Sequence, residues 1–422
     1  MKRREVFAAA LLCGWIGASI SVVGDAFLEY VFVVTAAHQR NGISIGVLGM
    51  VIGLPTLLGG WVGARLDLRR DKWALYLIGS LIGSALACCG LIAVLRTGAF
   101  AVTAYITVFL LGAFGLVTTT LWQASIPYFV REDRDAIKRV MGWTATTFTA
   151  GAAIGPIAAS LLVRYSGTAR LMIWDAVSFV LCAGLLIPVA RALRAGIALV
   201  EEPKMQVRPD WLAGIRKIMS EPLVRLPAIT LAVMNFVTYG VAFALPVLVV
   251  RRHLPDYLIA WISAAFVVGT MIGSIFATRF RHDRHFAAYL TSEPLLRGLG
   301  LLLVALSSSV VGLLLGTLLF TVPQGMGRVA RAGIMMTCFP GAQRAKIVGS
   351  YQMLVRSLMS AAPLAMQGLV ATVGIIGFFL LAALTLTALS AVVASDRTMR
   401  RLRHREVSLA GVVSSPIGES KI

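Results

Sequence analysis

Apolar segments of about the length needed to cross a membrane follow one another along most of the chain. A helix needs about 20 mostly apolar residues to cross roughly 30 Å of hydrocarbon. The alternation of apolar and polar positions that marks β-barrel strands is absent, so helices are expected. The pattern predicts twelve membrane-spanning helices, over residues 8–36, 44–64, 73–95, 99–121, 140–163, 170–190, 224–250, 257–278, 286–307, 310–336, 347–371 and 373–394.

The composition indicates an all-α membrane protein. Hydrophobic residues make up 58% of the chain, charged residues 14%, and the mean hydropathy is +0.84. A soluble domain has about 45–50% apolar and about 25% charged residues. Soluble enzymes, DNA-binding proteins and disulfide-stabilised domains are therefore excluded. No Gly-x4-Gly-Lys-Ser/Thr sequence is present, so ATP is not the expected energy source, and no cofactor is predicted. The five cysteines have no metal-binding spacing, so no metal site is predicted either.

The distribution of the basic residues predicts the orientation in the membrane. With the N-terminus in the cytoplasm, 29 of the 39 Lys and Arg fall in cytoplasmic segments, 6 on the other side and 4 inside spans. Cytoplasmic loops carry such an excess of Lys and Arg. We therefore expect both termini in the cytoplasm and a multi-pass protein of the cell inner membrane. The net charge of +20 is then a signal of topology, and no nucleic-acid partner is needed to explain it.

The predicted spans divide into two blocks of six. Residues 1–190 form an N-terminal half, 191–223 a cytoplasmic linker, 224–394 a C-terminal half and 395–422 a basic cytoplasmic tail that contacts anionic membrane lipid. Four apolar residues of the linker recur at helical spacing and predict a short amphipathic helix on the membrane surface: Trp211, Leu212, Ile215 and Ile218. Two blocks of six spans are typical of transporters built from repeats.

The fifth predicted span contains a specific pattern of small residues. Gly142, Gly151 and Gly155 are spaced Gly-x8-Gly-x3-Gly and precede Pro156. Glycines four residues apart share a helix face and let another helix approach closely, and proline can bend the helix. The spacing resembles the fifth-helix antiporter motif of the major facilitator superfamily, which is associated with exporters. The departure is Ala159-Ser160, where the family usually has two glycines.

The loop after the second predicted span resembles the signature loop of the same superfamily, Gly-x3-Asp-Arg-x-Gly-Arg-Arg/Lys. Gly63, Asp67 and Lys72 match, whereas Leu68 replaces the usual Arg. In the family this loop latches the cytoplasmic side of the two halves. The resemblance implies a latch here that depends on Asp67, Arg69 and Arg70.

Shorter motifs are similar to one branch of the superfamily, the drug:proton antiporters that include the enterobactin and other siderophore exporters and the macrolide efflux proteins. They are Gly24-Asp25-Ala26, Pro127 and the segment 175–179. The resemblance implies the major facilitator fold, with twelve helices in two halves. It also implies proton antiport, alternating access and export of a siderophore or a drug.

Ionisable groups inside spans are candidates for function because they are costly in hydrocarbon. Asp25 and Glu29 are four residues apart on one face of the first span, which lines the cavity in the superfamily. Two ionised carboxylates there would repel, so we expect them to carry protons. Alternatively, they pair with an arginine and hold the bundle together. Arg356, inside the eleventh span, is a candidate partner for either acid or for an anionic substrate.

Other intramembrane charges favour structural roles. Glu293 and Arg297 are four residues apart and predict a pair within one helix. Arg328 and Arg331 lie late in the tenth span and are expected to reach the membrane surface. Asp175 is expected to contact Arg170 or Arg164. Hydrogen-bonding side chains of the predicted cavity are as consistent with helix–helix contacts as with substrate binding: Gln123, Asn235, Tyr239, Gln324, Tyr351 and Gln352.

These features predict a secondary active transporter, not an enzyme, that works as a monomer. Its partners are an amphipathic small-molecule substrate, protons and membrane lipid. Two alternatives remain: a lysophospholipid or metabolite transporter of the same fold, and a non-transporting membrane sensor. A sensor should carry an additional soluble domain, and the sequence offers only loops and the tail.

Overall fold

The computed structural model describes residues 3–38, 43–67, 69–94, 100–130, 134–197, 211–279, 282–338, 351, 353–356 and 358–396. Within these ranges the regular secondary structure is helical and no strand occurs, which confirms an all-α protein for this part of the chain. The chain divides into two compact units. The first comprises Met1–Pro209 with Leu245–Ala264, and the second comprises Asp210–Ala244 with Ala265–Ile422.

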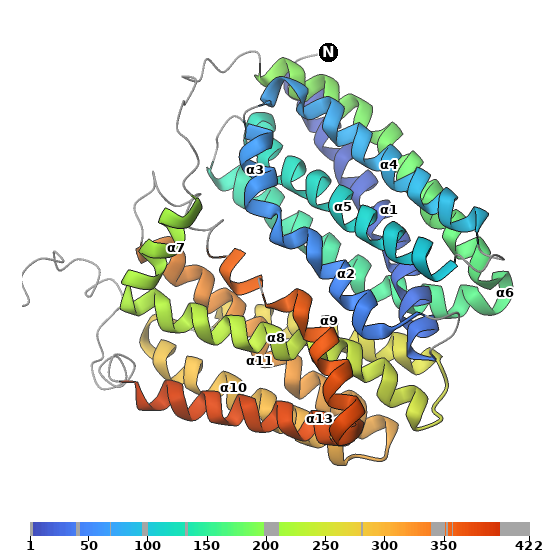
Figure 1. Cartoon of the computed structure of the whole chain (residues 1–422). Helices are drawn as coiled ribbons and strands as arrows, with labels where there is room; N and C mark the ends of the chain where they lie inside the picture. Colours follow the sequence, from blue (N-terminus) through green and yellow to red (C-terminus); the bar gives the residue numbers. More distant parts are fainter. Residues whose placement is uncertain are drawn as a thin grey trace, which may run out of the picture. The chain divides into compact units, whose positions relative to one another are not determined.

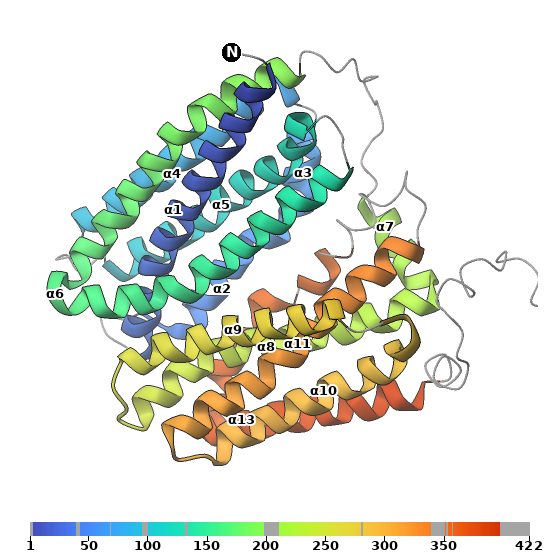
Figure 2. The same cartoon turned by 180° about the vertical axis from the view of Figure 1, so that it is seen from behind.

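The first unit is organised around its first and last helices. α1 (Arg3–Ala37) runs along α6 (Arg134–Ile197), and α6 also packs on α4 (Trp73–Ala93). α5 (Phe100–Val130) lies between α4 and α2 (Ile45–Leu57), as Figures 1 and 2 show from opposite sides. Two short helices, α3 (Gly59–Asp67) and the 3-10 helix η2 (Arg70–Lys72), connect α2 to α4.

The long helix α6 contains two of the predicted spans. Its two arms meet at Gly167, where φ is 75° and ψ is 166°. This region of backbone space is essentially restricted to glycine, because a Cβ atom would clash there. The break separates the segment that contains Gly151, Gly155 and Pro156 from the segment that contains Asp175. The expected fifth and sixth spans, 140–163 and 170–190, therefore correspond to the arms of one bent element.

The second unit includes α7 (Trp211–Ser220) and most of α8 (Pro222–Arg251) and α9 (Tyr257–Arg279). α10 (His282–Leu306) packs against both α11 (Val310–Cys338) and α13 (Ala362–Ser395), as Figures 1 and 2 show. The 3-10 helix η3 (Met359–Ala361) leads directly into α13. α13 bends at Gly374, with φ of 76° and ψ of 171°, in the same way as α6 bends at Gly167.

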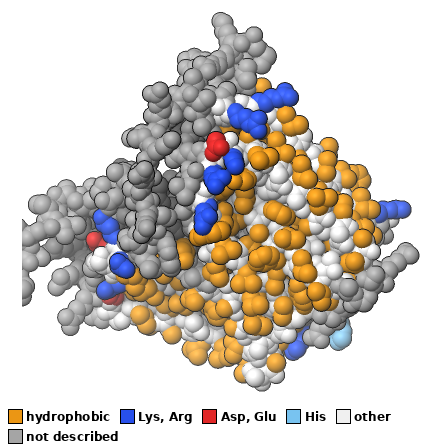
Figure 3. Space-filling model, turned by 45° about the horizontal axis from the view of Figure 1, so that its top comes forward, with side chains coloured by type: hydrophobic (Ala, Val, Ile, Leu, Met, Phe, Trp, Pro, Cys, Tyr) orange, Lys and Arg blue, Asp and Glu red, His pale blue; other side chains and the backbone are white. Residues whose placement is uncertain are grey.

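Nine helices among the described residues are long and apolar enough to cross a membrane: Ala9–Ala37, Trp73–Ala93, Phe100–Trp122, Ala169–Arg194, Val224–Arg251, Tyr257–Ala277, Ala288–Leu306, Val310–Arg328 and Met353–Ser395. Two further apolar helices, Ile45–Leu57 and Ala150–Val163, are shorter. Met353–Ser395 covers most of the predicted segments 347–371 and 373–394 and contains the bend at Gly374. The count of twelve spans stays a prediction. Side chains on the face in Figure 3 are largely hydrophobic, as expected of a surface in contact with lipid.

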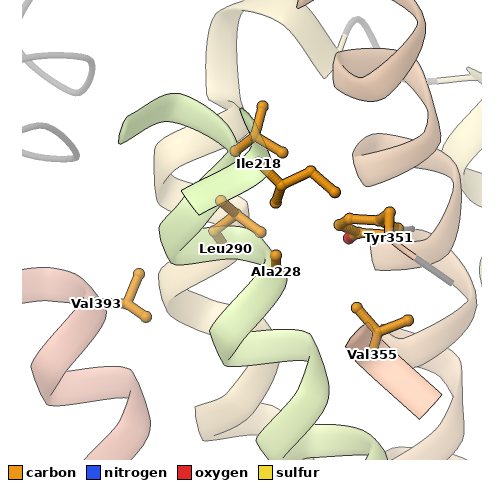
Figure 4. Close-up of a cluster of buried hydrophobic side chains, with 7 residues drawn as sticks. Ile218, Ala228, Leu290, Tyr351, Val355 and Val393 are labelled. Carbon is orange, nitrogen blue, oxygen red and sulfur yellow. The ribbon is translucent and has the colours of Figure 1, made fainter. Parts of the chain in front are cut away.

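The linker helix α7 is attached to the second unit by apolar packing. Ile218 is fully buried, while Arg216 and Lys217 are exposed. Figure 4 shows the cluster around Ile218, which collects side chains from helices far apart in sequence: Val224, Ala228, Leu290, Tyr351, Val355 and Val393. Burying a side chain of this size stabilises by about 1.5–3 kcal/mol. α7 is therefore part of the packed unit on one side and polar on the other.

Candidate functional site

Two carboxyl groups lie on one exposed face of α1. Asp25 and Glu29 are both exposed, whereas Gly24, Ala26 and Leu28 between and beside them are buried. α1 includes a predicted span, Ala9–Ala37, and both acids fall inside it. A carboxylate facing lipid at that depth would be costly, so such groups face a water-filled cavity or the interior of the bundle. The exposed acid face of α1 is therefore a candidate cavity wall.

Close helix packing holds this part of α1 in place. A Cβ atom on Gly151 would lie 2.5 Å from Val22 Cγ1, and one on Gly155 would lie 2.3 Å from Ala26 Cβ. The two glycines of α6 thus contact two residues of α1, also four positions apart, and the helices can approach only because the glycines have no side chain. The small-residue face predicted from the sequence packs against α1 within the first unit.

The second arm of α6 approaches the same segment of α1. A Cβ atom on Gly24 would lie 2.2 Å from Ser178 Oγ and 2.8 Å from Asp175 Oδ1. Asp175 is fully buried, and the Cys88 thiol donates to its Oδ2 at 3.4 Å. The expected contact of Asp175 with Arg170 is wrong, because Arg170 is exposed and forms no ion pair with Asp175. The side chain of Arg164, the other expected partner, is outside the described part.

Asp25, Glu29 and Asp175 form a group of three acids. The negative charges of Asp175 and Glu29 both act on Asp25. Among the described residues, none of the three forms an ion pair with a basic side chain. Sequence reasoning identified Asp25 and Glu29 but missed their proximity to Asp175, because residues 150 positions apart give no spacing signal. Carboxyl groups inside a membrane span and without a cation are suited to exchange protons, since the ionised form is costly in a low-dielectric environment.

The second unit contains a buried ion-pair network centred on Glu293. This side chain is fully buried and accepts two hydrogen bonds from Arg331, at 2.5 Å from Nη1 and 3.1 Å from Nη2. The expected pair within α10 exists, since Arg297 Nη1 lies 3.8 Å from Glu293 Oε1, but Arg331 is the closer partner. The expectation that Arg331 reaches the membrane surface is wrong: it is 4% exposed, because the carboxylate of α10 draws it inward.

Arg297 completes this network with weaker contacts. It is fully buried, donates from Nη2 to Thr238 Oγ1, and stacks its guanidinium 4.5 Å from the centroid of the Phe320 ring. Room for Glu293 comes from Gly327 of α11, where a Cβ atom would lie 2.2 Å from Glu293 Oε2. Removing Glu293 would leave two buried guanidinium groups without their carboxylate, which is strongly destabilising.

Two further arginines of the second unit are exposed. Arg328 follows Gly327 on α11, and Arg356 lies five residues after Tyr351. Arg328 is within electrostatic range of both Arg356 and Arg331. No ion pair involving Arg328 or Arg356 occurs in the part of the chain that the structure describes. Arg356 is thus exposed, as a role in a cavity requires.

The predicted polar residues of the cavity have different environments. Asn235 donates from Nδ2 to the Val355 carbonyl at 3.0 Å, and Tyr239 packs edge-on against Phe243 with ring centroids 5.5 Å apart. Gln324 Oε1 is buried without a hydrogen-bond partner in the described structure. Tyr351 is only 6% exposed and belongs to the apolar cluster of Figure 4. Of the two roles that the sequence allows for Asn235, substrate binding and a helix–helix contact, the structure shows the contact.

Several predicted residues lie outside what can be described. Gln352 is not among the described residues, and the side chains of Gln123, Gly142, Gly63, Asp67 and Arg70 are not described either. In the latch loop, Arg69 and Lys72 are exposed. Among the described residues, no group of three or more His, Cys, Asp or Glu side chains is arranged to hold a metal ion.

Comparison with known proteins places this geometry in a broad context. A family model described as Major Facilitator Superfamily matches residues 6–363. No curated protein matches the chain. The family match therefore covers most of the length of the chain.

Solved structures of transporters share the fold at low sequence identity. The human organic anion transporter MFSD10 (TETRAN) is 14% identical with a TM-score of 0.61, over 92% of this chain and 99% of that one. A bacterial homologue of the iron transporter ferroportin, inward-facing, is 14% identical with a TM-score of 0.64, over 93% and 99%. A bacterial homologue of the human lysosomal transporter Spinster is 13% identical with a TM-score of 0.63, over 95% and 97%. Likeness at this level of identity concerns the fold alone.

Proposed function

This chain belongs to the major facilitator superfamily and is a multi-pass membrane transporter, and we propose that it exports an amphipathic small molecule by proton antiport. The substrate class is a siderophore or a drug, and the cycle is alternating access of a monomer. In this proposal the chain crosses the inner membrane twelve times with both termini in the cytoplasm. Its N-terminal half is 1–190 and its C-terminal half 224–394, joined by the linker 191–223 and followed by the tail 395–422.

The observation that carries the proposal is the acid face of α1. Asp25 and Glu29 are exposed inside a predicted span, and Asp175 lies within electrostatic range of Asp25. A proton carrier needs a carboxyl that takes up and releases protons in a site reached from water. Each proton that enters down the membrane potential supplies about 2.3 kcal/mol per 100 mV, which is enough to drive accumulation of a solute.

The fifth-helix motif supports export as the direction of transport, because the motif that it resembles is associated with exporters. Its position beside α1 also suggests how it acts. Gly151 and Gly155 fit closely against Val22 and Ala26, directly beside Asp25. A rigid contact at this point would transmit movement of α6 to the acid face of α1, since packed helices shift as units. The latch loop, with Gly63, Asp67, Arg69, Arg70 and Lys72, would then hold the cytoplasmic side closed in one state of the cycle.

Everted membrane vesicles test the proton step. A pH-sensitive dye inside respiring vesicles reports proton release when a substrate is added. Two substrates are tested: ethidium, which is an amphipathic dye, and an iron-free catecholate. We expect release with at least one probe in the wild type, and its loss in Asp25→Asn and Glu29→Gln at equal protein levels. Glu221→Gln is the matched control, because Glu221 is a carboxyl between α7 and α8, outside the predicted spans. Equal release by the wild type and both variants in α1 would refute the proton role.

A further inference from the structure

The second unit carries an excess of positive charge inside its predicted spans. Electrostatic interactions link Arg356 to Arg328, Arg328 to Arg331, and Arg331 to Arg297. Glu293 is the one carboxylate in contact with this chain of guanidinium groups in the described structure, and it contacts Arg297 and Arg331. Four positive charges therefore face one negative charge, which leaves an excess of three.

The sequence offers no further carboxylate on α10 after Glu293, on α11, or on α13 before Asp396. Between Glu293 and Asp396 there is no aspartate or glutamate at all. The part of this stretch that the structure leaves undescribed adds two more basic residues, Arg344 and Lys346. Unpaired cations in a membrane-spanning bundle are costly, so the excess must be balanced from outside α10, α11 and α13.

The positions of the two outer arginines make them accessible to an external anion. Tyr351 and Val355, four residues apart, point into the apolar cluster of Figure 4. Arg356 is the next residue along the helix, about 100° away from Val355, and is exposed. Arg328 is also exposed and lies within electrostatic range of Arg356. The two exposed guanidinium groups thus interact with each other, and that of Arg328 also interacts with the buried Arg331.

Arg331, which interacts electrostatically with Arg328, retains a donor that is not used. Its Nη1 and Nη2 atoms bind Glu293, but its Nε atom is buried without a hydrogen-bond partner among the described residues. Arg297 likewise has Nε and Nη1 without a hydrogen-bond partner there. Buried donors of this kind are costly to leave unsatisfied, so an acceptor that reaches Arg331 Nε would be bound favourably.

We propose that Arg328 and Arg356, backed by Arg331, bind the carboxylate or phosphate group of the transported substrate. This inference rests on the proposed transport function and narrows its substrate class to amphipathic organic anions. Guanidinium groups present planar pairs of N–H donors that match the oxygens of a carboxylate or phosphate. Two such groups beside each other repel until an anion lies between them, so binding relieves an unfavourable interaction of the empty site.

Binding to the purified full-length protein in a neutral detergent tests this site without any transport assay. Thermal unfolding is followed by tryptophan fluorescence during titration with inorganic phosphate or benzoate, against chloride at the same ionic strength. We expect both probes to raise the unfolding temperature of the wild type. In Arg328→Gln and Arg356→Gln the apparent affinity should fall roughly tenfold or more, because a charge-assisted hydrogen bond is lost.

Matched variants separate a specific site from general electrostatics. Arg225→Gln removes an exposed arginine of α8 in the same unit and should leave the titration unchanged. The double variant Arg328→Lys with Arg356→Lys keeps the charge and should retain part of the effect. Equal titrations for the wild type and both glutamine variants, or an equal loss in Arg225→Gln, would overturn the proposal. A failure of proton release with normal anion binding would refute the proposed antiport and leave the anion site in place.

Lipid headgroups also carry phosphate groups, so a second experiment distinguishes a lipid from a transported substrate. The titration is repeated in nanodiscs of phosphatidylcholine with and without phosphatidylglycerol. A substrate site should bind phosphate and benzoate in both, with the same dependence on Arg328 and Arg356. If the arginine variants differ from the wild type only when phosphatidylglycerol is present, and soluble anions have no effect, the site is a headgroup site and the assignment to substrate is wrong.

Discussion

A single buried carboxylate holds together the charged interior of the second unit. Glu293 binds Arg331 through two hydrogen bonds and lies 3.8 Å from Arg297. The sequence indicates only the partner four residues away on the same helix, because the pair within α10 is encoded by local spacing. Arg331 is 38 residues away along the chain, and only the packing of α10 against α11 at Gly327 reveals it.

Glu293→Gln should act through stability. The substitution leaves two buried guanidinium groups facing a neutral amide, and breaking a buried ion pair in this way costs about 3–5 kcal/mol. We expect a lower yield of monodisperse protein and a lower unfolding temperature, measured by fluorescence-detected size exclusion and tryptophan fluorescence. Glu221→Gln, outside the predicted spans, should leave both unchanged. Wild-type yield and unfolding temperature in Glu293→Gln would show that the network does not stabilise the fold.

Two helices, α6 and α13, each bend at a glycine that follows a proline at the same spacing. Pro156 precedes the break at Gly167 by eleven residues (156 to 167), and Pro363 precedes the break at Gly374 by eleven residues (363 to 374). One position before each proline, Gly155 packs on Ala26 of α1 and the Ala362 carbonyl lies 3.7 Å from a Cβ built on Gly240 of α8. This correspondence between the units is what an internal repeat produces.

The breaks define where each predicted pair of spans turns. Gly167→Ala and Gly374→Ala should each lower stability by about 1–3 kcal/mol, because φ near 75° with ψ near 170° is a glycine-only region. Thermal unfolding of the purified variants measures this. Gly368→Ala in α13 is the control, since a Cβ there meets nothing within 4 Å and alanine favours a helix. Unfolding temperatures for the two break variants at or above those of Gly368→Ala would contradict the assigned backbone.

The contact between α6 and α1 predicts a larger effect for a bulkier residue. Gly155→Leu should lose transport and some stability, because a Cβ at this position already overlaps Ala26 and overpacking costs about 1–3 kcal/mol. Ala152→Leu is the matched control, since Ala152 is exposed on the same helix. Efflux and yield are measured for both. Equal tolerance of leucine at 152 and 155 would show that the motif is ordinary packing with no part in transport.

At the level of elements, the sequence predicts which segments are apolar helices but not how they join. The apolar runs 140–163 and 170–190 are separated by a short interval, so the sequence predicts two separate helices there. The structure continues the helix on both sides of Gly167, since one glycine conformation is enough to reverse direction. Helix joints depend on backbone angles, and hydropathy does not encode these.

The whole molecule divides its intramembrane charges by sign. In the first unit, Asp25, Glu29 and Asp175 have no basic partner among the described residues. In the second unit, four arginines interact electrostatically in a chain, and Glu293 pairs with two of them, Arg297 and Arg331. The family could be recognised from sequence because its motifs are local, and the match over residues 6–363 confirms it. The division of charge requires the tertiary structure, because each group is assembled from distant helices. Our account assigns protons to the acidic unit and an anionic group to the basic one.

Solute accumulation in proteoliposomes under an imposed pH gradient tests the central claim most directly. Wild-type protein should accumulate a substrate identified in the vesicle assay above its external concentration only when the gradient drives proton exit in exchange for the substrate. Asp25→Asn should lose this accumulation yet still exchange labelled for unlabelled substrate at equilibrium, because the proton site is lost while substrate binding remains. Accumulation by Asp25→Asn at the wild-type level, or accumulation by the wild type without any gradient, would contradict proton antiport through the acid face of α1.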